Sequence, residues 1–255
     1  MKSDDNEIKE WWNEASEYYQ TELNDTKPET VRYGPFGSTE RKLKLIGRVK
    51  GKRVLEVGCG GGQCSIALAK AGAECTGIDI SDKQLEYARS LAKKNDVRVE
   101  FIRSSFADIS KLKLKKYDVV ISVFALQYAK DLIKLFIRLY SLLKDKGLLV
   151  FSLDHPFYLT MSSTDLRMSD SYYRIGKFKE TEKWPDGSKH TFIMYKRKVS
   201  DIYNDLVKAG FYVETIIEPL DLDDKFWGPG YRRKLVRLIG PTIIFKARKV
   251  ANRPQ

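Results

Sequence analysis

The chain has 255 residues, of which 42% are hydrophobic and 31% are charged, and its formal net charge is +12. This length suits a single α/β domain with a substantial core, and the composition excludes a disordered or low-complexity protein. No run approaches the ~18 apolar residues of a membrane span, so no membrane partner is expected.

Charge and cysteine usage indicate compartment and partners. The positive excess raises encounter rates with anions, including nucleic acid, but denser basic stretches occur only at residues 231–237 and 246–253. A solvated surface rich in Lys and Glu explains this pattern more simply than an RNA-binding face. The polar, acidic start of the chain is unlike a secretory signal. The odd number of cysteines (Cys59, Cys64 and Cys75) favours reduced thiols over a disulfide framework. We therefore predict a cytoplasmic protein.

The N-terminal part predicts a helical cap. Residues 7–23 carry Trp and Tyr at near-helical spacing, which is typical of an aromatic helix. A turn rich in Gly and Pro follows at 33–37, and a helix is predicted from Thr39 to about Val49. We treat residues 1–38 as a cap on a single domain spanning residues 1–255.

The most specific motif lies where the first predicted strand ends. Apolar residues 53–55 lead into EVGCGGG at 56–62, and a helical pattern follows at 63–71. A strand that ends in a glycine turn and feeds a helix presents backbone N–H groups to a ligand. A second apolar run ends in Asp79, and an acid at the tip of a neighbouring parallel strand can accept hydrogen bonds from a ribose. Together these features predict an adenosine-containing cofactor.

Glycine spacing separates the candidate cofactors. A dinucleotide fingerprint reads G-x-G-x-x-G, whereas Gly58, Gly60 and Gly62 read G-x-G-x-G, and Gln63 stands where the third dinucleotide glycine belongs. Residues 54–79 resemble the class I S-adenosylmethionine-dependent methyltransferases, whose first motif is E-x-G-x-G-x-G. The resemblance covers about residues 30–250 and implies S-adenosylmethionine (SAM) as the cofactor. The same spacing disfavours a nicotinamide-dependent oxidoreductase.

Strands and helices alternate after this turn, which indicates a parallel sheet. Ser81 to Gln84 has the pattern of a capping box, in which the Gln84 side chain reaches back to the cap. Further helices are predicted after Asp131, with an apolar stripe, and after Ser200. The stripe consists of Ile133, Phe136, Ile137, Tyr140 and Leu143. The predicted strands after the first span residues 75–79, 97–102, 117–122, 148–153, 211–217 and 242–247.

The resemblance adds the topology to this α/β pattern. It implies a Rossmann-like, doubly wound seven-stranded sheet of order 3-2-1-4-5-7-6, with the last strand antiparallel. Residues 155–195 are the least regular part and carry many aromatic side chains, among them Trp184. We expect them to form an insert on the substrate side of the sheet.

The resemblance also implies roles for residues at the carboxyl ends of the strands. Backbone of the glycine turn meets the methionine part of the cofactor, Glu56 supports the turn or reaches the amino group, and Asp79 takes the ribose. Either Tyr33 or Arg32 binds the carboxylate. The full set of expected cofactor contacts is Tyr33, Glu56, Gly58, Cys59, Gly60, Gln63, Asp79, Ile80, Ser105, Phe106, Ser122 and Val123.

The adenine edge departs from the family pattern. Members often carry Gly-Asp after the third strand, and here Ser105 takes the position of that acid, with Phe106 beside it. A hydroxyl can accept the same hydrogen bond without charge assistance. Asp108 is an alternative acceptor.

Candidate catalytic residues follow the fourth and fifth strands. Tyr128 is expected to face the acceptor, whereas Phe124 and Leu126 can either face it or pack in the core. His155 precedes Pro156 and can act as a general base, because imidazole titrates near neutral pH. It can equally be a hydrogen-bonded turn residue. No metal site is predicted.

We therefore predict a SAM-dependent methyltransferase acting on a small molecule held between the aromatic cap and the insert. One alternative is an RNA methyltransferase, such as a tRNA enzyme, that uses the basic C-terminal segment. Another is a non-catalytic SAM-binding protein. The sequence leaves the acceptor and the oligomeric state open.

Overall fold

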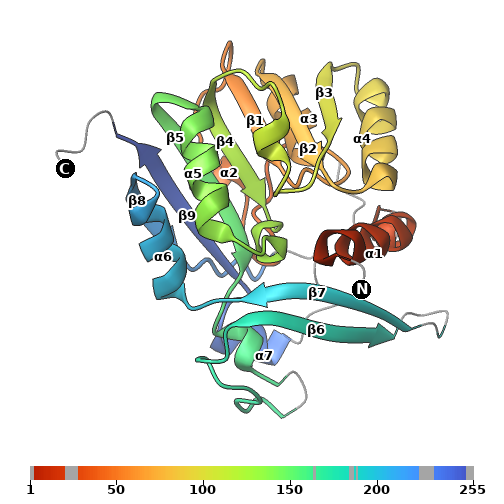
Figure 1. The fold of residues 1–255 in the computed structure, drawn as a ribbon, viewed down its shortest axis with the longest axis vertical. Helices are drawn as coiled ribbons and strands as arrows, with labels where there is room; N and C mark the ends of the chain where they lie inside the picture. The colour runs from red at the N-terminus through yellow and green to blue at the C-terminus, as the bar shows by residue number, and fades with distance from the viewer. Residues whose placement is uncertain are drawn as a thin grey trace.

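A seven-stranded sheet forms the centre of the protein, with strand order β3-β2-β1-β4-β5-β9-β8 (Figure 1). The computed structural model describes residues 3–20, 28–162, 165–183, 187, 189–223 and 233–250. Neighbours among β1 to β5 pair in parallel, and β9 is antiparallel to both β5 and β8. The predicted order and the antiparallel last strand are confirmed. The strands are β1 (Arg53–Val57), β2 (Glu74–Asp79), β3 (Val99–Arg103), β4 (Tyr117–Val123), β5 (Leu143–Asp154), β8 (Phe211–Ile217) and β9 (Thr242–Lys249).

Helices cover both faces of the sheet and bury its apolar residues. Helices α5 and α6 pack on one face through rings such as Phe136, Phe151 and Phe211. Helix α3 and residues 31–49 pack on the other, through Leu68 and Val150 among others. The helices are α1 (Asp4–Tyr18), α2 (Glu40–Leu43), α3 (Gln63–Lys70), α4 (Asp82–Lys94), α5 (Leu132–Leu142), α6 (Val199–Lys208) and α7 (Arg233–Leu238), with short 3₁₀ turns η2 (Ile109–Lys111), η3 (Leu126–Tyr128) and η4 (Tyr158–Thr160). No helix in the described ranges combines the length and apolar character needed to span a bilayer.

The helix predicted from residue 39 to 49 is much shorter than expected. It ends at Leu43 because Lys44 adopts a left-handed conformation. The Glu40 carboxylate then accepts hydrogen bonds from the backbone N–H groups of Leu45, Ile46 and Gly47 at 2.9–3.0 Å. A side chain thus takes the donors that a longer helix would have used internally.

The apolar stripe predicted for α5 is only partly correct: Phe136 and Leu143 are buried and Ile133 and Tyr140 pack against the core, but Ile137 does not. Ile137 is 52% exposed, while the buried side chains are Leu132, Leu135, Phe136, Leu139 and Leu142. Apolar residues occupy more than one face of this helix, so periodicity alone did not select the buried one. The chain also enters β5 at Leu143, before the predicted end of the helix.

The insert at 155–195 is more regular than expected. It contains β6 (Gly176–Lys183) and β7 (Lys189–Lys196), which pair as an antiparallel hairpin. Trp184 lies outside the described residues, as do parts of the two basic stretches, residues 231, 232 and 251–253.

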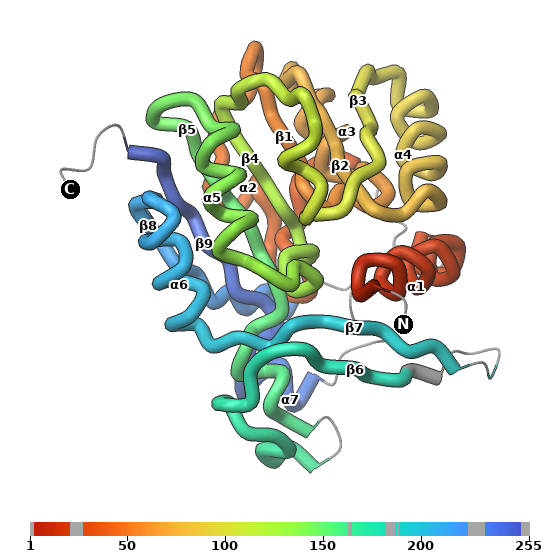
Figure 2. Tube along the Cα trace, viewed as in Figure 1, coloured from red at the N-terminus to blue at the C-terminus, as the bar shows by residue number. Residues whose placement is uncertain are grey.

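Helix α1 lies along this hairpin, beyond the edge where the parallel strands end (Figure 2). Asp4 receives hydrogen bonds from Lys177 and from the Tyr195 hydroxyl, and Lys179 pairs with Glu7 at 2.7 Å. The cap and the insert therefore form one layer over the carboxyl ends of the strands.

Candidate cofactor and acceptor site

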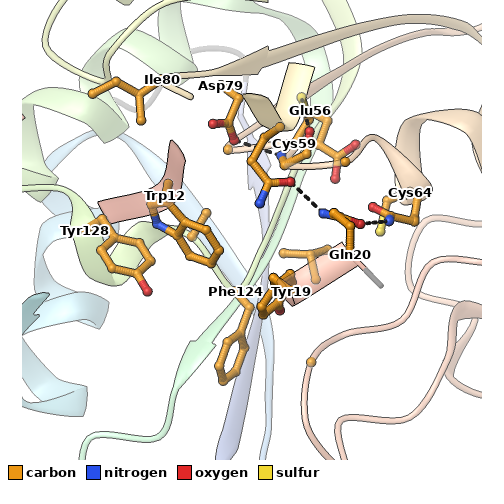
Figure 3. Close-up of a pocket in the computed structure, with 18 of the residues that line it drawn as sticks. Trp12, Tyr19, Gln20, Glu56, Cys59, Cys64, Asp79, Ile80, Phe124 and Tyr128 are labelled. Atoms are coloured by element: carbon orange, nitrogen blue, oxygen red, sulfur yellow. Dashed lines mark hydrogen bonds between the residues drawn. The ribbon is translucent and has the colours of Figure 1, made fainter. Parts of the chain in front are cut away.

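A cavity opens at the carboxyl ends of β1, β2 and β4, beneath α1 (Figure 3). Its empty space amounts to about 1180 Å³, counting the part open to solvent. The glycine turn forms one wall, and residues 123–125 after β4 form another. This is the edge of an open α/β sheet where ligands bind.

The glycine turn leaves its backbone open toward the cavity. Gly58 has a φ of +73°, and a Cβ there would lie 2.3 Å from the Ala125 Cβ. At Gly60, with a φ of +50°, the nearest atom to an added Cβ is the Gln84 Oε1 at 3.7 Å. Only glycine fits the first position, and the second presents bare main chain to a ligand.

Asp79 holds this turn in place. Its Oδ2 accepts from the Gly60 N–H at 2.8 Å and its Oδ1 accepts from the Ser81 N–H at 2.9 Å. Burial raises the pKa of this carboxyl above its usual range. The Ile80 N–H is a third backbone donor that lowers this pKa. A carboxylate has about four acceptor sites, so at least one remains for a hydroxyl group of a ligand.

The predicted capping box forms only in part. The Ser81 Oγ accepts from the Gln84 N–H at 3.1 Å, as predicted. The Ser81 N–H, however, donates to Asp79 and not to the Gln84 side chain, which bonds to Gln20 instead.

Glu56 joins the first strand to the helix after the turn. It is 2% exposed, and its Oε2 accepts from the Ser65 N–H at 2.8 Å and from the Ser65 Oγ at 2.5 Å. Burial raises the pKa of Glu56 to about 7, against the lowering effect of these two bonds. The residue also lines the cavity, so supporting the turn and facing a ligand are compatible.

Two serines expected at the cofactor do not line the cavity. The Ser105 Oγ pairs with the Asp108 carboxylate at 3.4 Å, while the neighbouring Ser104 lines the wall together with Phe106. The Ser122 Oγ donates to the Val57 carbonyl at 2.6 Å, and Val123 lines the cavity instead. Ser122 and Val123 are neighbours in β4 and point to opposite faces of the sheet, so only one of them can reach the site.

The polar end of the cavity differs from the predicted one. Tyr33 is fully buried and donates its hydroxyl to the Glu40 Oε2 at 2.6 Å, so it is not available to a carboxylate in the cavity. Arg32, the other candidate, lines the cavity. Beside it, the Gln20 amide donates to Gln84 at 2.5 Å and accepts from Gln63 at 2.6 Å (Figure 3). Sequence reasoning missed Gln20 because no local pattern distinguishes it.

Aromatic side chains form the opposite end. The Trp12 ring meets Tyr19 and Tyr128 edge to face, with ring centroids 5.3 and 5.7 Å apart (Figure 3). Phe124 lines the same space with a φ of +54°, a conformation that costs energy for a bulky residue and concentrates at functional sites. Leu126 is fully buried in the core. Of the two residues left open by the sequence, Phe124 faces the cavity and Leu126 does not.

His155, for which the sequence left the roles of base and of turn residue open, does not line the cavity. It is 6% exposed, its Nε2 lies 2.9 Å from the Glu218 Oε1, and its Nδ1 accepts from the Phe157 N–H at 3.1 Å. Both ring nitrogens are therefore occupied by bonds that fasten the end of β5. The turn interpretation of His155-Pro156 agrees with this geometry.

A family model described as a methyltransferase domain matches residues 48–192. A ubiquinone biosynthesis O-methyltransferase of Bordetella avium is 33% identical over 122 residues, which cover 48% of this chain and 46% of that protein. The chain thus spans about half the length of this relative.

Solved structures give the same assignment over more of the chain. A SAM-dependent methyltransferase from Mesorhizobium loti is 27% identical, with a TM-score of 0.63 over 80% of this chain and 94% of that one. The magnesium protoporphyrin IX methyltransferase of Synechocystis PCC 6803 with bound SAH shares the fold at 20% identity, with a TM-score of 0.62 over 97% of this chain and all of that one.

Proposed function

The chain belongs to the class I S-adenosylmethionine-dependent methyltransferases, and we propose that it methylates a small molecule with an apolar body. SAM supplies a methyl group on a sulfonium centre, which is a good leaving group. The protein then has to bind, orient and exclude water, since positioning accounts for much of the rate of such a transfer.

The residues of the cavity fit SAM. We assign the ribose to the remaining acceptor capacity of the Asp79 carboxylate, and the adenine to the space between Ile80 and Phe106. The bare backbone at Gly60 accepts the methionine part. Arg32 and Gln63 are the donors proposed for its carboxylate.

The layer that covers the cavity is the observation that supports a small acceptor. Helix α1 and the β6–β7 hairpin lie across the strand ends, and Trp12, Phe124 and Tyr128 wall the remaining space. Among the described lining residues the charged ones are Asp5, Arg32, Glu56 and Asp79, so acids outnumber cations. A nucleic acid needs the reverse balance along its path. Relatives named ubiquinone biosynthesis O-methyltransferases point toward small acceptors as well.

Thermal shift and methyl-transfer assays test this function. SAM and S-adenosylhomocysteine (SAH) should raise the melting temperature, because they bind only the folded state, while NAD should not. Labelled SAM should then transfer its methyl group to a member of a panel of phenols, catechols and amines, and not to bulk tRNA. The Gly58→Val variant, whose side chain would collide with Ala125, is the cofactor-free control. Labelling of tRNA alone would favour the RNA enzyme, and binding without turnover would favour a non-catalytic protein.

A further inference from the structure

We propose that Asp154 is the catalytic base, and that the acceptor is a hydroxyl or amine compound whose proton passes to this carboxylate. The inference rests on the proposed function. It assigns to Asp154 the role that the sequence suggested for His155.

Sheet register places Asp154 on the same face of the sheet as Val123, which lines the cavity, although Asp154 itself is not among the lining residues. Ser152 of β5 pairs with Val123 of β4, and Val123 lines the cavity. Side chains two residues apart on a strand point to the same face, so Asp154 projects on the face of Val123, about 7 Å further toward the strand end. The Phe124 N–H donates to the Ser152 carbonyl at 2.9 Å, which keeps this end of β5 against the aromatic wall.

The antiparallel partner of Asp154 also indicates on which face of the sheet the Asp154 side chain lies. Asp154 pairs with Thr242 of β9, whose Oγ1 donates to the Pro35 carbonyl at 2.6 Å. Pro35 follows directly on Arg32 to Gly34, the segment that contributes Arg32 and Gly34 to the cavity wall. His155, the next residue of the chain, points to Glu218 on the opposite side.

The surroundings of Asp154 leave its carboxylate free to accept a proton. In the described part of the chain its only hydrogen-bond donor is its own backbone N–H, and no cation pairs with it. Three titratable groups lie near it: Tyr19 after α1, Tyr158 in η4 and Glu180 in β6. Of these, Tyr19 also lines the cavity. Such an unpaired acid costs stability, and that cost is typical of residues kept for function.

The basicity of the group suits the task. Burial, followed by the negative charge of Glu180, raises the pKa of Asp154 to about 7. A general base works best when its pKa lies near the working pH, because it is then both deprotonated and basic. Aspartate with its usual pKa of ~3.9 would be a much weaker base.

The chemical step balances with these groups. The lone pair of the acceptor oxygen or nitrogen forms a bond to the methyl carbon as the methyl–sulfur bond breaks. The electron pair of that bond stays on sulfur, which leaves neutral SAH. The acceptor proton moves to Asp154 and from there to solvent. Acceptors that have no proton to lose, such as tertiary amines, need no such base.

Sinefungin tests the position of Asp154 without knowledge of the acceptor. This SAM analogue carries an ammonium group on carbon where SAM carries its methylated sulfonium, so its extra charge samples the point of transfer. At pH 8 we expect Asp154→Asn to weaken sinefungin binding at least about tenfold, the size of a lost charge-assisted hydrogen bond. SAH binding should change less than about threefold, because SAH lacks that charge. Calorimetry measures both constants.

Two further variants make the result specific. Glu218→Gln is the matched control: it removes a neighbouring carboxylate on the His155 side and should alter neither ligand. Glu180→Gln removes the charge that raises the Asp154 pKa, so the preference for sinefungin should persist to a lower pH than in the wild type. This variant also tests the inference if Asp154→Asn does not fold.

The outcomes separate the two proposals. If SAH binds and Asp154→Asn leaves the sinefungin-to-SAH ratio unchanged, Asp154 does not face the point of transfer and the inference is wrong. An unchanged pH dependence in Glu180→Gln would count against it in the same way. If SAH does not bind the wild-type protein, the proposed function itself fails.

Discussion

At the scale of single residues, Asp79 is expected to dominate cofactor affinity. Asp79→Asn keeps the size of the side chain but removes the charge and replaces one acceptor by a donor, which faces the N–H of Gly60 or Ser81. We expect SAH affinity to fall roughly 10- to 100-fold, the cost of one or two charge-assisted bonds. Asp82→Asn, an exposed acid three residues on, is the control. Equal affinity in both variants, measured by calorimetry, would contradict the assignment.

Glu56 is expected to make stability depend on pH. The folded protein holds the Glu56 proton up to about pH 7, while the unfolded chain releases it near 4.5. Because the folded state binds more protons between these values, this residue lowers the free energy of unfolding as pH rises through that range. The full effect is about 3 kcal/mol at most.

Glu56→Gln removes this dependence. The difference between the melting temperatures of the variant and the wild type should shift by several degrees in favour of the variant from pH 5 to pH 8. The altered bonds to Ser65 add a cost that is the same at both pH values. Glu74→Gln, a change at an exposed glutamate, is the control. Melting curves of Glu56→Gln and wild type that shift in parallel with pH would show the prediction to be wrong.

His155 is expected to matter for stability and not for the cofactor. His155→Phe removes the bonds to Glu218 and to the Phe157 N–H while filling similar space. We expect a loss of about 1–3 kcal/mol in the free energy of unfolding, because a partly buried N–H loses its acceptor. SAH affinity should stay within twofold of the wild type. Urea unfolding and calorimetry measure the two quantities. A large loss of SAH affinity with unchanged stability would contradict this prediction and indicate that His155 belongs to the cofactor site.

At the scale of elements, one contact couples the end of the cap to the glycine turn. A Cβ on Gly61 would lie 2.6 Å from the Gln20 Nε2, so Gly61→Ala should displace the Gln20 amide from Gln63 and Gln84. We expect each of Gly61→Ala and Gln20→Ala to cost about 1–3 kcal/mol through the two lost bonds. The double variant should cost little more than either one. Additive losses in urea unfolding would mean that the two residues do not interact.

At the scale of the whole molecule, the cap, the hairpin and the glycine turn are expected to respond to the cofactor together. Helix α1 contacts the hairpin through Asp4 and Glu7, and residue Gln20 beyond it contacts the turn. Hydrogen exchange should therefore slow on SAH binding in α1, in β6–β7 and in residues 58–63. Strand β8, at the far edge of the sheet, is the internal control. Protection confined to the turn would show that the cap moves independently.

Sequence by itself determined the features whose cause is local. A strand running into EVGCGGG and the acid that ends the next strand required only neighbouring residues, and both formed as predicted. Alternating strands and helices indicated the parallel sheet, and the family resemblance supplied the strand order. Local patterns carry this information because turns, caps and strand periodicity act between residues close in the chain.

Tertiary structure alone decided which side chains face the cavity. Arg32 rather than Tyr33, Ser104 rather than Ser105, and Val123 rather than Ser122 line it. Each pair consists of neighbours, and pairing register, together with contacts such as that of Tyr33 with Glu40, determines which of the two turns inward. Gln20 likewise reaches Gln63 and Gln84 only after the chain has folded. Such choices depend on segments far apart in sequence, so no local pattern could have specified them.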